Sequence, residues 1–393
     1  AELENLASTA LRVTGTADDT PAQPPLTAAE LTALGIASVT DDNLEAVVAA
    51  IASQPDGTAV NDLTLLGNVA SGAIAGFDTA LGKVQVYAGD DQTAVVSGSP
   101  PELSDYEDLG IDFTALSDEA DLVDSVNTVL ASMPVDGSDV DTATKVKAIV
   151  QAYDAIRTAN DQGTLDLGPT NYEALGLGVA VDFTVDGAQK VSLLNSVLDA
   201  KSTNVGDVDD WSDLEALAIT VKGVIDTAAN RTADPALTKS ALTALGLSGV
   251  TDDNLEAMIA AIAGENGGAA VDDFTKLSTV VSNTATRCTE ALTAVTNYAG
   301  DGTNDIGLNS TNSNAPYAAP TASHYEALGI DLTGYASSAD LVDSVNTVLA
   351  SLPVIGNDDS SAPDVSTAAE FKAIFAAYDA IRLADGDGSG ETL

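Results

Sequence analysis

The stretch ADLVDSVNTVLAS at residues 120–132 occurs a second time, without a single change, at residues 339–351. Two further stretches recur: VTDDNLEA at 39–46 returns at 250–257, and KAIVQAYDAIR at 147–157 returns as KAIFAAYDAIR at 372–382. These positions give offsets of 219, 211 and 225 residues. They indicate a long internal period of roughly 220 residues, in which the loops differ in length.

A shorter period lies inside the long one. The motif Leu-Gly-[Ile/Leu] begins at Leu34, Leu109, Leu175, Leu245 and Leu328. The spacings predict units of about 70 residues in three types, A, B and C. The expected order is the end of a C unit at 1–23, A at 24–100, B at 101–168, C at 169–233, a second A at 234–320 and a second B at 321–393.

Each motif is predicted to end a short helix, which we call the opening helix of its unit, because a glycine after the last helical residue is a common stop signal. We expect the leucine of each motif to be buried against the preceding unit. A Ser or Thr three residues before a Glu is typical of a capping box. The predicted boxes are Thr27/Glu30, Ser104/Glu107, Thr170/Glu173 and Ser323/Glu326, and Ala241 removes the box that Thr238 would begin.

Longer helices follow each short one. Apolar residues at helical spacing predict a core face in Leu44, Val47, Val48 and Ile51 of the first A unit. The corresponding faces elsewhere are Leu255, Met258, Ile259 and Ile262; Leu122, Val126, Val129 and Leu130; Val146, Ile149, Val150, Tyr153 and Ile156; and Phe371, Ile374, Phe375, Tyr378 and Ile381. The prediction is an all-α fold, a tandem array of small helical bundles in an A-B-C super-repeat.

One predicted helix is interrupted by glycine. It runs from Leu63 to about Leu81 and contains Gly67, Gly72 and Gly76. We interpret these glycines as positions where another helix approaches closely, although each costs a helix about 1 kcal/mol relative to alanine. The connector at 300–320, rich in Asn, Ser and Thr, is predicted to be an exposed loop that could also bind a partner.

The charge excludes several classes of function. The net charge is −46, with 14 Lys and Arg against 60 Asp and Glu. This field repels nucleic acid and anionic membranes, but it favours solubility and divalent cations. No run of 18 apolar residues is long enough to span a membrane. The single cysteine, Cys288, cannot form an intrachain disulfide and is predicted to be a small buried residue in a helix.

Catalytic chemistry is not expected. The only histidine, His324, lies at a helix start where the equivalent unit has Asp105, which favours a surface role. The sequence contains no phosphate-binding loop, dinucleotide fingerprint or zinc-ligand spacing. No catalytic residue and no organic cofactor is therefore predicted.

One candidate metal site lies near the C-terminus. Asp385, Asp387 and Ser389, with Gly390 next, match the first six positions of a calcium-binding EF-hand loop. The glutamate of position 12 would fall beyond Leu393, so a flexible acidic turn is the alternative. Three other acidic clusters precede helices and are expected to act as N-caps: Asp136, Asp139 and Asp141; Asp207, Asp209 and Asp210; and Asp358, Asp359 and Asp364.

The phrases LTALGI at 31–36, VTDDNLEAVVAAIA at 39–52, NYEALG at 171–176 and AYDAIR at 152–157 resemble the Ala/Asp-rich helical repeats of giant bacterial adhesin-like surface proteins. The resemblance covers nearly the whole chain. It implies an extracellular, stalk-forming or adhesive role and no catalytic residues. The glycine-aspartate calcium nonapeptides that often end such proteins are not found in this sequence.

Two functions fit these observations. The first is a structural extracellular spacer or stalk segment of a giant bacterial surface adhesin, whose partners are the neighbouring repeat units. The second is a subunit of a self-assembling extracellular filament or surface layer, whose partners are copies of itself. The chain begins inside a C unit and stops before the next one, which we expect of either a fragment or a protomer of a longer array.

Overall fold

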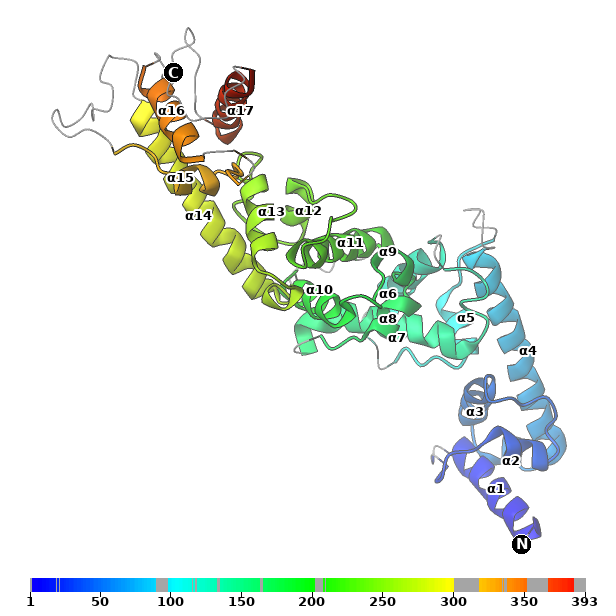
Figure 1. The fold of residues 1–393 in the computed structure, drawn as a ribbon. Helices are drawn as coiled ribbons and strands as arrows, with labels where there is room; N and C mark the ends of the chain where they lie inside the picture. The colour runs from blue at the N-terminus through cyan, green and yellow to red at the C-terminus, as the bar shows by residue number, and fades with distance from the viewer. Residues whose placement is uncertain are drawn as a thin grey trace. The chain divides into compact units, whose positions relative to one another are not determined.

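A computed structural model describes residues 2–18, 20, 22–89, 98–114, 116, 119–132, 135–162, 165–201, 208, 210–299, 318–333, 335, 338–351 and 367–384. Every regular element among these residues is a helix, so the all-α prediction is confirmed for the part of the chain described. The chain divides into two compact units, Ala1–Ala218 and Ile219–Leu393. Figure 1 shows the helices of each unit.

The first unit contains ten complete helices and the beginning of an eleventh in the residues described. They are α1 (Glu2–Ala17), α2 (Ala28–Ala33), α3 (Leu44–Ala52), α4 (Leu63–Ala88), α5 (Leu103–Asp108), α6 (Glu119–Leu130), α7 (Ala143–Gln162), α8 (Pro169–Ala174), α9 (Gly178–Val181) and α10 (Gly187–Lys201), with a short 3-10 turn, η1 (Gly57–Val60). Helix α11 (Trp211–Ala228) begins in this unit and ends in the second.

The second unit repeats much of this order. After α11 come α12 (Lys239–Ala244), α13 (Leu255–Gly264), η3 (Gly268–Ala270), α14 (Phe274–Ala299), α15 (Ala322–Ala327), α16 (Ser338–Ser351) and α17 (Ala368–Ala384). Helices α4 and α14 have the same length, 26 residues, and start 211 positions apart. The predicted glycine-interrupted helix is confirmed and extends to Ala88.

The two long helices each pack against helices on both sides of them in sequence. Helix α4 contacts α3 before it and α5 and α6 after it, and α14 contacts α13, α15 and α16. Figure 1 shows α13 near one end of α14, and α15 and α16 toward the other. The first half of α4 buries Leu66 and Ala70 in a core with α1, α2 and α3. The last turns of α14 bury Val295 and Ala299 in a core with α15, α16 and α17.

All five opening helices, α2, α5, α8, α12 and α15, end as predicted. The glycine after each has a positive φ between 79° and 99°: Gly35, Gly110, Gly176, Gly246 and Gly329. The next residue donates its N–H back to the fourth helical residue, as in Ile111 to Tyr106, which satisfies a free carbonyl. Of the five leucines that begin the motif, Leu109, Leu175, Leu245 and Leu328 are buried and Leu34 is half-buried.

The starts of the opening helices correct part of the prediction. The capping box of Thr27 and Glu30 is confirmed, and Thr238 caps α12 through its side chain alone. The other three helices start two residues earlier than predicted, with N-cap residues Glu102, Gly168 and Thr321. Their N-cap amides donate to Asp105, Asn171 and His324. These side chains accept the N-cap amide hydrogen, as the glutamate of a capping box does. The tyrosine that follows each of them, Tyr106, Tyr172 or Tyr325, is buried.

The interpretation of the glycines in α4 is wrong for two of the three. A Cβ at Gly67 or Gly72 would have no atom within 4 Å among the contacts described, so no helix approaches closely there. At Gly76 a Cβ would lie 3.4 Å from the carboxylate carbon of Asp108, an ordinary contact. The equivalent residues of α14 are Ser278, Asn283 and Arg287. Because side chains fit at those positions, α4 gains no close contact from its glycines there.

Candidate functional site

The most distinctive site in the first unit is a joint between α3, the turn after α5 and the start of α7. We define the first joint by Asp42, Glu45, Ala46, Gly110 and Lys147. The amide of Ala143, the first residue of α7, donates to the Asp42 carboxylate at 3.0 Å. The Lys147 Nζ lies 2.5 Å from the Glu45 carboxylate. Contacts over a hundred residues of sequence therefore fix α7 against α3.

Gly110 is the closest approach in this joint. A Cβ there would lie 2.6 Å from the backbone nitrogen of Ala46, and φ is +81°. Any side chain would thus push the turn after α5 away from α3 as well as strain its own backbone. The glycine that ends a helix also permits two elements to touch.

The second unit contains the same arrangement. We define the second joint by Asp253, Glu256, Ala257, Gly329 and Lys372, which occupy equivalent positions of the repeat. A Cβ at Gly329 would lie 2.8 Å from the Ala257 nitrogen, and Lys372 pairs with Glu256. The two joints therefore share the close glycine and the Lys–Glu ion pair.

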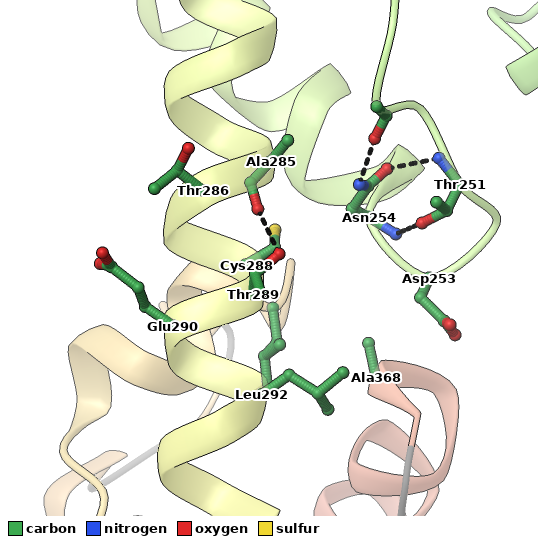
Figure 2. Close-up of a pocket in the computed structure, with 12 residues that line it drawn as sticks. Thr251, Asp253, Asn254, Ala285, Thr286, Cys288, Thr289, Glu290, Leu292 and Ala368 are labelled. Carbon is green, nitrogen blue, oxygen red and sulfur yellow. Dashed lines mark hydrogen bonds between the residues drawn. The ribbon is translucent and has the colours of Figure 1, made fainter.

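A cavity of about 550 Å³ lies beside the second joint. Its lining includes Cys288, Ala285, Leu292, Asp253 and Ala368. Figure 2 shows that Cys288 and Leu292 come from α14, Asn254 from the start of α13 and Ala368 from the start of α17. At the positions of Cys288 and Ala285, helix α4 has Phe77 and Ile74. Two large side chains of α4 are thus replaced by small ones in α14.

The Cys288 thiol at this cavity is in a state of low reactivity. Cys288 Sγ donates a hydrogen bond to the carbonyl of Ala327 at 2.8 Å, and burial raises the pKa of the thiol. A raised pKa keeps the thiol protonated at neutral pH, so it is a poor nucleophile and a poor metal ligand. The expectation of a buried cysteine is confirmed.

Buried tyrosines form a second recurring feature that the sequence did not reveal. The Tyr106 hydroxyl donates to the side-chain oxygen of Asn127 at 2.7 Å, and the Asn127 amide donates to the carbonyl of Pro101 at 3.0 Å. The same three-part contact joins Tyr172, Asn195 and Leu167, and Tyr325, Asn346 and Pro320. We call each a tyrosine clasp. The available signal was a Tyr followed 21 or 23 residues later by an Asn.

The starts of α3 and α13 use an asparagine differently. Asn43 accepts from the Thr40 amide at 2.8 Å and donates to the Ser38 carbonyl at 3.0 Å. Asn254 repeats this with Thr251 and Gly249. Figure 2 draws the bonds between Asn254 and Thr251 as dashed lines. These two asparagines hold the turn that leads into the joint.

The predicted calcium ligands Asp385, Asp387 and Ser389 lie outside the described residues. Within the residues described, no group of three or more His, Cys, Asp or Glu side chains is arranged to hold a metal ion. Of the other acidic clusters, Asp210 accepts from the Ser212 amide at the start of α11, and Asp136 accepts from Ser138. Hydrogen bonds from Ser138 lower the pKa of Asp136. The remaining predicted N-caps that also lie outside the described residues are Asp207, Asp209, Asp358, Asp359 and Asp364.

His324 has a structural contact. Its ring Nδ1 accepts the amide hydrogen of Thr321 at 3.0 Å, the position that Asp105 and Asn171 fill in the related helices.

Among the helices described, none combines the length and apolar character needed to cross a bilayer. Comparison of the chain with protein-family models, curated proteins and solved structures finds no match.

Proposed function

We propose that this chain is a structural spacer, a segment of an extracellular stalk in a giant bacterial surface adhesin, built as an A-B-C array of helical units. The observation that supports the proposal is the recurrence of the joint. Gly110 and Gly329 meet α3 and α13 in the same way, and Lys147 and Lys372 pair with equivalent glutamates. A contact that recurs in each period fixes the geometry of its helices each time, which is what a spacer requires.

The charge supports the same proposal. At −46, the chain resists non-specific association with other acidic surfaces and stays soluble at high local density. Such a stalk needs no catalytic residue and no organic cofactor, and the proposal assigns none. Its partners are the neighbouring units, and its location is the bacterial cell surface.

The test is to change the number of repeats. Inserting a second copy of residues 24–234, one full period, should add a constant increment to the maximum dimension measured by small-angle X-ray scattering. A variant in which Lys147 and Lys372 become Glu places like charges at both joints. It should keep its helix content by circular dichroism and lose the constant increment. A maximum dimension unchanged by the insertion would reject the spacer.

The second candidate is a subunit of a self-assembling extracellular filament. It differs in covalent continuity, because a stalk is one polypeptide and a filament consists of separate chains. The mass of the native polypeptide separates the two. The observation that favours the filament is a pair of exposed apolar helix faces.

A further inference from the structure

Helices α7 and α17 carry the same face in different surroundings. In α7 the side chains of Ile149, Ala152, Tyr153 and Ile156 are at most 4% exposed. The equivalent residues of α17 are Ile374, Ala377, Tyr378 and Ile381. Ile374 and Tyr378 are half-buried, Ala377 is exposed, and Ile381 is 51% exposed. Nearly identical side chains therefore need a cover that α17 does not have among the described residues.

Other elements of the first unit pack on the apolar face of α7. Helices α8 and α10 pack on it, and the Tyr153 hydroxyl donates to the carbonyl of Val208 at 2.9 Å. Val208 lies just before α11. The amide of Trp211, the first residue of α11, donates to Thr128 of α6 at 3.0 Å. The start of α11 therefore lies on the helix pair α6–α7.

Helix α1 is the repeat equivalent of this part of α11. Leu3, Leu6 and Ala7 correspond to Leu214, Leu217 and Ala218, which are at most 4% exposed. In α1, however, Leu3 is 81% exposed, Leu6 is half-buried and Ala7 is exposed. The first half of α1 thus presents an apolar face of the kind that is covered in α11.

We propose that the first half of α1 in one copy of the chain docks on the outer face of α17 in a second copy. Leu3 and Leu6 would then lie against Ala377 and Ile381, the exposed apolar residues of α17. This inference rests on the filament alternative of the proposed function and names its contact surfaces. Because the two faces differ, the contact is head-to-tail, so each copy can bind one copy through α1 and another through α17.

Sedimentation analysis of the 393-residue protein over a range of concentrations tests the proposal. A salt concentration of about 1 M, at which the Debye length is about 3 Å, screens the repulsion between acidic copies. We expect the mean mass to rise with concentration without a fixed limit. Leu3→Asp or Ile381→Asp should each weaken association at least tenfold, about 1.4 kcal/mol. The matched control is Val179→Asp, because Val179 is an 87% exposed apolar residue of α9 and should not affect association.

Mixing the two variants tests the direction of the contact. Leu3→Asp keeps an intact α17 face and Ile381→Asp keeps an intact α1, so an equimolar mixture should form dimers and no larger species. Both residues are exposed, so the melting temperatures should match the parent protein. The proposal is overturned if the parent stays monomeric at every concentration, or if either variant alone associates as the parent does. A monomer whose length still grows with inserted repeats would overturn the docking and leave the spacer intact.

Discussion

The hydroxyl of Tyr106 is buried, so its hydrogen-bond partner must come from the protein. Asn127, on the helix that follows α5, is that partner, and its amide in turn satisfies the carbonyl of Pro101. One asparagine of α6 therefore forms hydrogen bonds with two buried polar groups, and these bonds hold α5 and the residues before it against α6. Burial raises the pKa of Tyr106, so the phenol remains a donor throughout the physiological range.

Removing the asparagine should cost more than removing the hydroxyl. In Asn127→Leu, the Tyr106 hydroxyl and the Pro101 carbonyl both lose their partner, and each unsatisfied buried group costs about 1–3 kcal/mol. Tyr106→Phe should cost about 1 kcal/mol, because the asparagine keeps its bond to Pro101. Urea unfolding of both variants measures the difference. If both variants had the same free energy of unfolding as the parent protein, the hydrogen bonds of the clasp would contribute nothing to stability.

The two joints predict opposite responses to exchange of a single side chain. Phe77→Cys should lower the free energy of unfolding by about 3 kcal/mol, since a buried ring would be lost and a void left. Cys288→Phe should be neutral or stabilising, because a cavity already lies beside Cys288. Thermal unfolding of both variants is the measurement. A large destabilisation by Cys288→Phe would show that the cavity cannot accept the ring that α4 carries.

The capping box of α2 should respond to pH through Glu30. The hydrogen bond from Arg12, followed by those from Thr27, lowers the pKa of Glu30 below 4.5. A lowered folded-state pKa stabilises the fold above 4.5, and this is lost as the pH falls through the folded value. Glu30→Gln should therefore reduce the melting temperature at pH 7 and have little effect well below 4.5.

The control for this pH dependence is Thr238→Val, which removes the cap of α12. Position 241 there is an alanine, so the cap contains no titrating carboxylate. Its effect on the melting temperature should be the same at both pH values. A Glu30→Gln effect that persisted unchanged at low pH would contradict the role given to the carboxylate.

At the scale of elements, local signals predict helix ends better than helix starts. Leu-Gly-[Ile/Leu] identifies the ends of all five opening helices, because a left-handed glycine stop depends only on neighbouring residues. Hydroxyl residues usually cap helices, which favours Ser104, Thr170 and Ser323 as N-caps. In the structure the N-cap residues are Glu102, Gly168 and Thr321, and their backbone amides donate to the side chains of Asp105, Asn171 and His324. The joints and clasps escape prediction because their partners are 21 to 102 residues apart.

The glycines of α4 provide a direct test of how closely other elements pack on this helix. Gly67→Ala and Gly72→Ala should each stabilise the protein by up to about 1 kcal/mol, because alanine favours the helix and meets open space. Gly110→Ala should destabilise it, since φ is positive and the methyl group would meet the Ala46 nitrogen. Chemical denaturation of the three variants is sufficient. If Gly72→Ala lowered the free energy of unfolding, the interpretation of Gly72 as a position of close helix approach would be correct after all.

At the scale of the whole molecule, the charge of −46 should make stability depend on salt. Calcium is expected to act beyond screening if Asp385, Asp387 and Ser389 bind it. Millimolar calcium should then raise the melting temperature more than sodium chloride of matched ionic strength. Asp385→Asn with Asp387→Asn should abolish the extra increase. If the two salts act alike, the acidic residues form a solvating surface and no specific calcium site exists.

The long helix α4 has a mechanical consequence for such a chain. Its first half belongs to the core that contains Leu66, and its second half buries Phe77 and Val84 beside α5 and α6. A pulling force applied to the polypeptide therefore reaches both cores through one continuous rod. Unwinding of α4 removes packing from both cores, so we expect the two cores to rupture together, in a single step with a long release of chain.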